Sequence, residues 1–109
     1  MRKFLGTYNP IYTKTFEKQL RGLNGKYLER VEEKIQDLVN DPWHNTAFLK
    51  GQYRGKRKLR LNRTDRLLFV ICEECQELRH NGIYNDCDDC DDIPENTIKI
   101  AGIIFKHKY

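Results

Sequence analysis

A basic segment, residues 50–66, carries the side chains best suited to chemistry on a phosphate group. Its eight cations are Lys50, Arg54, Lys56, Arg57, Lys58, Arg60, Arg63 and Arg66, and the segment holds one acid. Within it the run KRKLRLN alternates in the pattern of a β-strand, which puts two leucines on one side and Lys58 and Arg60 on the other. Phosphate contacts dominate nucleic-acid affinity, and fixed cations also stabilise charge that develops on a phosphate during a reaction. We interpret the segment as a phosphate-binding strand that either catalyses a reaction or only binds nucleic acid.

The chain's only cysteines form a second motif with chemical meaning. They are Cys72, Cys75, Cys87 and Cys90, which make two matching C-x-x-C pairs. Two such pairs complete a tetrahedral zinc site, and four protein ligands leave no position open for a substrate. The spacing therefore predicts a structural zinc site, with iron or disulfides as the alternatives.

The cysteines lie in an acidic insert, residues 72–96. The insert holds nine acidic residues and one arginine, so its net charge is −8, and since the whole chain has +4 the remainder carries +12. The insert contains few apolar residues, so it cannot fold by hydrophobic burial alone. A bound metal would supply the free energy of folding that burial does not provide. Its acidity fits either competition with RNA for the basic surface or a merely solubilising role.

The apolar periodicity predicts a first strand and two helices ahead of the basic segment. A short apolar and aromatic run, Phe4 to Tyr8, indicates a strand that stops at Asn9-Pro10. From Ile11 apolar residues recur at helical spacing as far as a glycine-rich break at residues 22–25. A second helical stripe runs from Tyr27 to Val39 and ends at Asn40-Asp41-Pro42. We expect these two helices to form an antiparallel hairpin.

After a loop at residues 42–48 the pattern becomes that of strands. The predicted strands are Lys56–Asn62, Arg66–Ile71 and Thr97–Phe105, with a tight turn at residues 63–65. The sequence therefore predicts one α+β domain over residues 1–109, in which the helix pair covers one face of an antiparallel three-stranded sheet. The acidic insert lies between the last two strands. The opposite face, with Lys58 and Arg60, is left free for a ligand.

Length and hydropathy narrow the class of protein. A chain of 109 residues suits a single small domain. No apolar run approaches the length of a membrane span, and the start MRKFLGTYNP lacks the apolar middle of a signal peptide. We expect a cytoplasmic protein with no membrane partner.

Several short motifs follow one another in a fixed order along the chain. They are Leu38-Val39-Asn40-Asp41-Pro42, Leu49-Lys50-Gly51, KRKLRL, Arg66-Leu67-Leu68-Phe69-Val70 and the close IIFKHKY. Together with the order of the elements, this succession resembles the RelE/ParE toxins of bacterial and archaeal toxin–antitoxin pairs. The resemblance covers nearly the whole chain apart from residues 72–96.

The resemblance implies a RelE-like fold and a metal-independent endoribonuclease that cuts mRNA in the ribosomal A site. In such an enzyme a ribose 2′-hydroxyl attacks the adjacent phosphate, which requires a proton acceptor, a proton donor and stabilisation of the five-coordinate phosphorus. The residues that match the catalytic positions are Lys58, Arg60, Arg66, His107 and Tyr109. On an extended strand His107 and Tyr109 point the same way, and histidine has a pKa near neutrality. Lys106 and Lys108 are the alternatives to His107.

The resemblance also implies partners. They are a cognate antitoxin protein, the ribosome and mRNA. The cations expected to attract RNA without taking part in catalysis are Lys50, Arg54, Lys56, Arg57, Arg63 and Lys106. Two other functions stay open: a ParE-like toxin that binds DNA gyrase and does not cut RNA, and a non-enzymatic nucleic-acid-binding module stabilised by zinc. The nuclease is favoured by the combination of Lys58, Arg60 and Arg66 with His107 and Tyr109.

Overall fold

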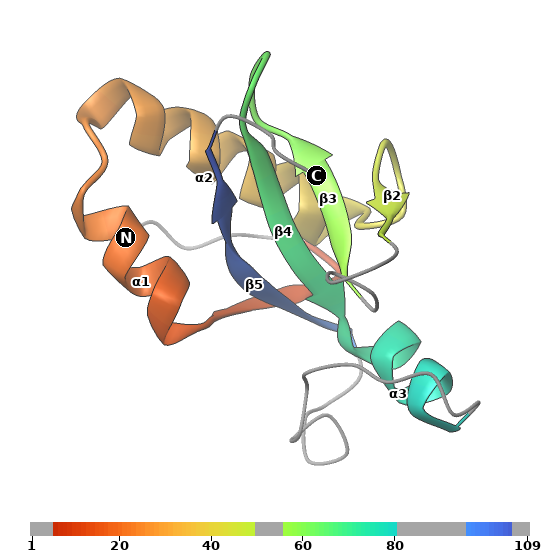
Figure 1. Cartoon of the computed structure of the whole chain (residues 1–109). Helices are drawn as coiled ribbons and strands as arrows, with labels where there is room; N and C mark the ends of the chain where they lie inside the picture. Colours follow the sequence, from red (N-terminus) through yellow and green to blue (C-terminus); the bar gives the residue numbers. More distant parts are fainter. Residues whose placement is uncertain (1–5, 50–55, 81–95, 106–109) are drawn as a thin grey trace.

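The computed structural model describes residues 6–49, 56–80 and 96–105, without the side chains of residues 78–80. In this part of the chain five strands form one sheet, in the order β1-β5-β4-β3-β2, with three helices beside it (Figure 1). The elements are β1 (Asn9–Tyr12), α1 (Lys14–Arg21), α2 (Gly25–Asn40), β2 (Ala47–Phe48), β3 (Arg57–Arg60), β4 (Arg66–Ile71), α3 (Cys72–His80) and β5 (Thr97–Ile104). β1 is parallel to β5, and the other neighbours are antiparallel. The predicted α+β class is confirmed, but the sheet has five strands rather than three.

The first strand lies further along the chain than the sequence predicts. Residues 4 and 5 fall outside the described part, residues 6–8 bend, and β1 begins at Asn9 and includes Pro10. Proline is tolerated there because β1 is the outermost strand, where one side of the backbone needs no ladder partner. Asn9 starts the pairing, since its N–H donates to the carbonyl oxygen of Asn96 at 2.8 Å. The prediction that Asn9-Pro10 ends the strand is therefore wrong.

Both predicted helices form, and each begins at a side-chain cap. Thr13 precedes α1 and its hydroxyl accepts from the N–H of Phe16 at 3.1 Å. Asn24 precedes α2 and its side-chain oxygen accepts from the N–H of Tyr27 at 2.9 Å. Such caps satisfy N–H groups that have no partner inside a helix. Because α1 begins after Thr13, Ile11 belongs to β1 and not to the first helix.

The helices α1 and α2 cover one face of the sheet, joined by a short turn (Figure 1). One continuous core lies between the helices and the sheet. Its fully buried members include Phe16, Val31, Ile35, Leu67, Phe69, Ile71, Ile98 and Ile100. The α2 part of this core is the stripe that the sequence predicts. β4 contributes Leu67, Phe69 and Ile71 to it, and Leu68 and Val70 on the other side of β4 are buried as well.

β5 extends beyond the end of its neighbour β1. Along this part of its edge, side chains at α1 form the hydrogen bonds that a neighbouring strand would otherwise form. A register shift at Leu68/Phe69 leaves Ala101 out of the β4–β5 ladder, and the Thr13 hydroxyl donates to the Ala101 carbonyl at 2.8 Å. Gln19 then exchanges two hydrogen bonds with the backbone of Ile103, at 2.8 and 3.0 Å. The amide of Gln19 thus takes the place of a strand neighbour, which keeps the exposed edge satisfied.

The acidic insert begins as a helix. α3 follows β4 without a break, and its residues Cys72 and Cys75 are fully buried in a small cluster with Val70. Two acids dock α3 on the body: Glu73 accepts a short hydrogen bond from the hydroxyl of Tyr8, and Glu74 pairs with Arg57. Residues 81–95 lie outside the described part. In the residues that are described, no helix is long and apolar enough to cross a membrane.

Candidate functional site

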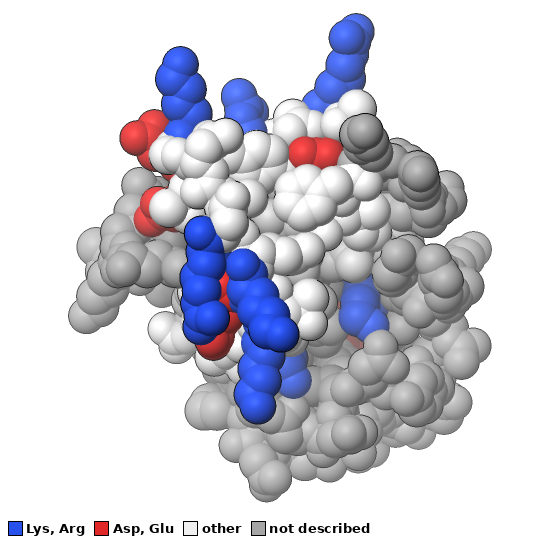
Figure 2. Space-filling view, turned by 60° about the vertical axis from the view of Figure 1, so that its left-hand side comes forward, with Lys and Arg blue, Asp and Glu red and all other residues white. Residues whose placement is uncertain are grey.

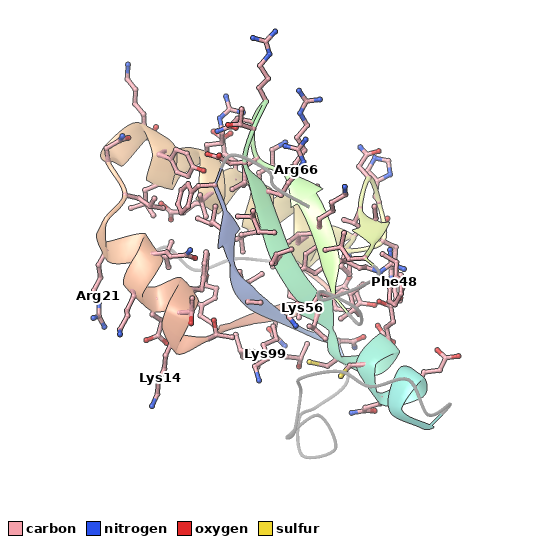
Figure 3. All side chains as sticks on the ribbon, in the orientation of Figure 1. Lys14, Arg21, Phe48, Lys56, Arg66 and Lys99 are labelled. Carbon is pink, nitrogen blue, oxygen red and sulfur yellow. The ribbon has the colours of Figure 1, made fainter. Side chains whose placement is uncertain are left out.

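The face of the sheet opposite the helices carries cationic side chains from three strands. On β3, Leu59 lies in the core, so Lys58 and Arg60 on either side of it project to the other face. Arg66 begins β4, and Lys99 lies between two buried isoleucines of β5. Arg66 lies at the end of the sheet away from α3, whereas Lys99 lies nearer to it (Figure 3).

Two of these cations, Arg60 and Arg66, share one hydrogen-bond acceptor. They are directly opposite each other in the β3–β4 ladder. Arg60 Nε donates to the carbonyl oxygen of Asn62 at 3.2 Å, and Arg66 Nη1 donates to the same oxygen at 3.0 Å. Like charges opposite each other destabilise a sheet. Two guanidinium groups held this way have a geometry suited to an anion between them.

The turn that joins β3 to β4 holds this arginine pair in place. Asn62 Oδ1 accepts from the N–H groups of Thr64 and Asp65, at 2.9 and 2.8 Å. Asp65 is buried and accepts from the hydroxyl of Tyr27 on α2 at 2.6 Å. Burial and the hydrogen bond to Asp65 raise the pKa of Tyr27, so its hydroxyl keeps the proton that it donates. The turn is thereby fastened to α2, which fixes the direction of both arginines.

Two lysines of the sheet face are partly buried. Lys58 pairs with Ala47 of β2 on one side and with Leu68 of β4 on the other. Lys99 was not among the predicted site residues, because it lies in the strongly apolar run TIKIAGII. Its place between Ile98 and Ile100 was the available signal, since alternation assigns it to the face away from the core. Lys56, Lys58 and Lys99 each interact with another residue of the protein.

Arg57 lies on the side of β3 opposite to Lys58. Its guanidinium forms a two-pronged ion pair with Glu74, with Nη2 at 2.8 Å from Oε2 and Nε at 3.0 Å from Oε1. It also lies over the rings of Trp43 and Phe48. Arg57 is thus occupied within the protein, and its predicted role in attracting RNA stays a prediction. Arg63 is exposed at the tip of the turn beside Arg60.

A groove of about 880 Å³ adjoins the arginine pair. It lies between α2 and β3, and its lining includes Arg30, Lys34, Arg60 and Arg63 together with buried leucines. Arg30 Nη1 donates to the carbonyl oxygen of Leu61 at 3.3 Å. Arg60 therefore faces both the open sheet surface and the mouth of this groove.

A second group of cationic side chains lies far from this face. Figure 2 shows Lys and Arg gathered on the side of the molecule where α1 lies, next to an uncharged area. The exposed cations of α1 are Lys14, Lys18 and Arg21. They offer matched controls for substitutions at the arginine pair.

The predicted proton carriers belong to the C-terminal end of the chain. His107, Tyr109 and Lys106 lie outside the described residues, as do Lys50 and Arg54. The last described part of the chain nevertheless ends beside the arginine pair. Ile104 pairs with Arg66, and the ring of Phe105 lies 6.1 Å from that of Tyr27, measured between centroids.

The structure describes two of the four predicted zinc ligands. Cys72 and Cys75 lie three residues apart at the start of α3, are not joined in a disulfide and are both buried. Residues three apart lie on one face of a helix, which suits two thiolates that bind one ion. Cys87 and Cys90 are outside the described residues, and no group of three or more possible metal ligands occurs within them.

Several solved structures have a fold similar to that of this chain. The toxin–antitoxin complex RelBE2 from Mycobacterium tuberculosis contains a chain that is 22% identical, with a TM-score of 0.62 over 91% of this chain and 98% of that one. The archaeal RelE–RelB complex from Pyrococcus horikoshii gives 17% identity and a TM-score of 0.63 over 94% and 99%. The YoeB/ParE toxin from Agrobacterium tumefaciens gives 10% identity and a TM-score of 0.61 over 90% and 98%. The chain therefore has the fold of RelE, YoeB and ParE toxins.

No protein-family model matches the chain, and no curated protein matches it significantly.

Proposed function

We propose that this chain, whose fold is that of the RelE/ParE toxins, is the toxin of a toxin–antitoxin pair and cuts mRNA on the ribosome. The observation that carries the proposal is the arginine pair. Arg60 and Arg66 lie opposite each other on the face of the sheet that the helices leave open. Fold alone does not specify activity, so the proposal depends on what this face can do chemically.

The proposed reaction is attack of a ribose 2′-hydroxyl on the adjacent phosphate, with departure of the 5′-oxygen of the next nucleotide. The transition state gathers negative charge on the oxygens around phosphorus. Guanidinium groups bind two such oxygens at once and stay protonated at all physiological pH values. Lys58, Arg60 and Arg66 are proposed to stabilise this charge at the scissile phosphate.

Proton transfer requires further groups. We assign it to His107 and Tyr109, with Lys106 and Lys108 as alternatives to His107, on the strength of the family resemblance. The pairing of Ile104 with Arg66 supports the assignment, because the chain leaves β5 next to the arginine pair. Lys50, Arg54, Lys56 and Arg63 are proposed to attract RNA.

A cognate antitoxin is the proposed partner of the chain. Several of the similar solved structures are complexes of a toxin with its antitoxin. The proposed targets, ribosome and mRNA, imply that the chain works in the cytoplasm.

We also propose a structural zinc ion bound by Cys72, Cys75, Cys87 and Cys90. The burial of the first two cysteines on one face of α3 supports it. Metal analysis of the purified chain by mass spectrometry tests it: one zinc per chain is expected, lost on Cys72→Ser and on Cys87→Ser. Iron in place of zinc, or two disulfides without metal, would contradict it.

Expression in a bacterial host tests the function. The chain is expected to arrest growth and to leave mRNA cut within translated regions, and Arg60→Ala with Arg66→Ala is expected to abolish both effects. Arg21→Ala, which removes one exposed cation of α1, serves as the control and should leave them unchanged. Trapped DNA breaks with intact mRNA would instead indicate a gyrase-directed toxin, and RNA binding without growth arrest would indicate a non-enzymatic module.

A further inference from the structure

The groove between α2 and β3 has a cationic end and an anionic end, a separation of charge that the proposed reaction does not require. Four charged residues of its lining recur at helical spacing along one side of α2 and its C-cap: Arg30, Lys34, Asp37 and Asp41. The two cations come first along the helix and the two carboxylates follow. Lys34 and Asp41 are about 10 Å apart along the helix axis, so charges of opposite sign lie at opposite ends of the groove.

The cationic end lies beside the arginine pair. Arg30 Nη1 donates to the carbonyl oxygen of Leu61, the residue that follows Arg60. Arg63 lines the groove from the turn between β3 and β4. The anionic end lies further along α2, which passes behind β4 and β3 toward β2 (Figure 1). An RNA strand that has one phosphate at the arginine pair can therefore place a neighbouring phosphate at the cationic end.

The charges of the groove are not paired with one another. In the residues that the structure describes, the side chains of Lys34, Asp37 and Arg63 form no hydrogen bond or ion pair. Lys34 and Asp37 are three residues apart on the helix, a spacing at which opposite charges can meet. Both charges are instead available to a ligand that carries an anion at one end and hydrogen-bond donors at the other.

The floor of the groove between these ends is apolar. Leu38, Leu59 and Leu61 line it, and all three are buried in the core. A groove of about 880 Å³ has room for a nucleotide. Apolar surface with a few polar groups around it is typical of sites that bind small ligands, and here it suits the flat face of a base.

The carboxylates select among the possible ligands. A carboxylate only accepts hydrogen bonds, and it can accept two side by side. Of the four RNA bases, guanine alone presents two adjacent N–H donors on its Watson–Crick edge, because each of the others has an acceptor beside its donor. An acidic peptide would meet repulsion from Asp37 and Asp41, and a basic one from Lys34 and Arg63. A guanine nucleotide matches both ends of the groove.

We propose that the groove binds a guanine nucleotide of RNA next to the cleaved phosphate, with Lys34 and Arg63 on its phosphate and Asp37 on its base. The inference rests on the proposed function, because it takes RNA as the ligand. It adds a preference for one base, which the phosphate-binding cations cannot supply since every nucleotide carries the same phosphate.

Binding of three short RNA strands of equal length tests the preference. One strand is uridine throughout, and the others have a single guanosine or a single inosine in its centre. All carry 2′-O-methyl groups, which prevent the proposed reaction. By fluorescence anisotropy of a label at the 5′ end, the guanosine strand is expected to bind roughly 5- to 150-fold more tightly than the uridine strand, the range for one two-pronged base contact. Inosine lacks the 2-amino group, and its strand should fall between them.

Two matched substitutions on α2 locate the base contact. Asp37→Asn leaves a side chain that cannot accept two hydrogen bonds side by side, so the preference for guanosine should disappear. Glu33→Gln removes the same charge at an exposed position of α2 that does not line the groove. It should leave the preference unchanged.

A second pair of substitutions locates the phosphate contact. Lys34→Ala is expected to weaken the binding of all three strands alike and to reduce the slope of log affinity against log salt concentration by about 0.7, as for one phosphate contact. Lys26→Ala removes an exposed cation at the start of α2, outside the lining of the groove, and serves as its control. Thermal melting verifies that each variant is folded.

The outcomes separate this inference from the proposed function. Equal binding of the guanosine and uridine strands, with growth arrest intact, would overturn the inference and leave the function standing. Binding of no strand by a chain that arrests no growth would overturn both. A guanosine preference that survives Asp37→Asn would show that the carboxylate does not contact the base. If the Asp37 and Lys34 variants bind RNA normally but escape inhibition by the antitoxin, the groove is a protein-docking surface and the inference is wrong.

Discussion

Arg60 on β3 and Arg66 on β4 are directly opposite each other, and both donate a hydrogen bond to the carbonyl oxygen of Asn62. This shared acceptor holds two positive charges on one side of the sheet. An anion placed between the two guanidinium groups would remove their mutual repulsion. The pair is therefore suited to a phosphate whose charge grows during a reaction.

Two substitutions of Arg66 distinguish the effect of its positive charge from the effect of its planar shape. Arg66→Lys keeps the positive charge but loses the planar fork that grips two oxygens. We expect Arg66→Ala to lower the rate of RNA cleavage roughly 100- to 1,000-fold, the range for removing one donor to a developing anion. Arg66→Lys should fall between this variant and the native chain in a single-turnover assay. Equal rates for lysine and alanine would show that charge alone is insufficient.

Tyr27 is predicted to support the arginine pair from a distance. Tyr27→Phe removes the hydrogen bond to the buried carboxylate of Asp65 but keeps the ring that contacts Phe105. The loss should lower the free energy of unfolding by about 1.5–3 kcal/mol, as for a hydrogen bond to a charged group. Urea denaturation measures this loss. Cleavage should also slow, even where the variant is fully folded, because the turn no longer holds Arg66 in place.

The ion pair of Arg57 with Glu74 is expected to fasten α3 to the sheet. Both side chains are mostly buried, at 16% and 14% exposure. Glu74→Gln leaves the guanidinium without its counter-charge, which should cost about 1–3 kcal/mol. Glu77→Gln makes the same change in charge at an exposed position of the same helix and should cost little. Faster hydrogen exchange in α3 for the first variant, and not for the second, would establish the role of the pair.

Tyr12 is expected to make the free energy of unfolding fall at alkaline pH. Burial, with a smaller contribution from the negative charge of Glu32, raises the pKa of Tyr12 from 10.0 to about 12. Because the folded state favours the neutral phenol, this contribution to stability is complete below pH 10 and is lost as the pH rises toward 12. Tyr12→Phe should therefore lose less stability than the native chain between these values. Parallel urea titrations at several pH values in this range check the difference, and identical slopes would contradict it.

Much of the fold is predictable from the local pattern of apolar and polar residues. β4 has the predicted bounds because RLLFVI is a continuous apolar run, and α2 follows its apolar stripe as far as Asn40. β2 was not predicted, since a strand of two residues has no periodicity and exists through its pairing with Arg57 and Lys58. The position of β1 depends on a parallel partner almost ninety residues away, which local sequence does not reveal.

The candidate site was predicted in part. Alternation around Leu59 identified Lys58 and Arg60, but the pairing of Arg60 with Arg66 depends on the register of the hairpin. The same alternation assigns Arg57 to the other side and Lys99 to the open face, and neither consequence was drawn from the sequence. α3 was missed because its cysteines suggested a metal-bound turn, although CEECQELRH is rich in residues that favour helices.

The most direct test of the central claim is cleavage of ribosome-bound mRNA by the purified chain in a translation extract. We expect cuts within codons that leave a 2′,3′-cyclic phosphate, and loss of cleavage in the chain with Arg60→Ala and Arg66→Ala, with Arg21→Ala as active as the native chain. Undiminished cleavage by the double variant would contradict the claim that this arginine pair forms the active centre.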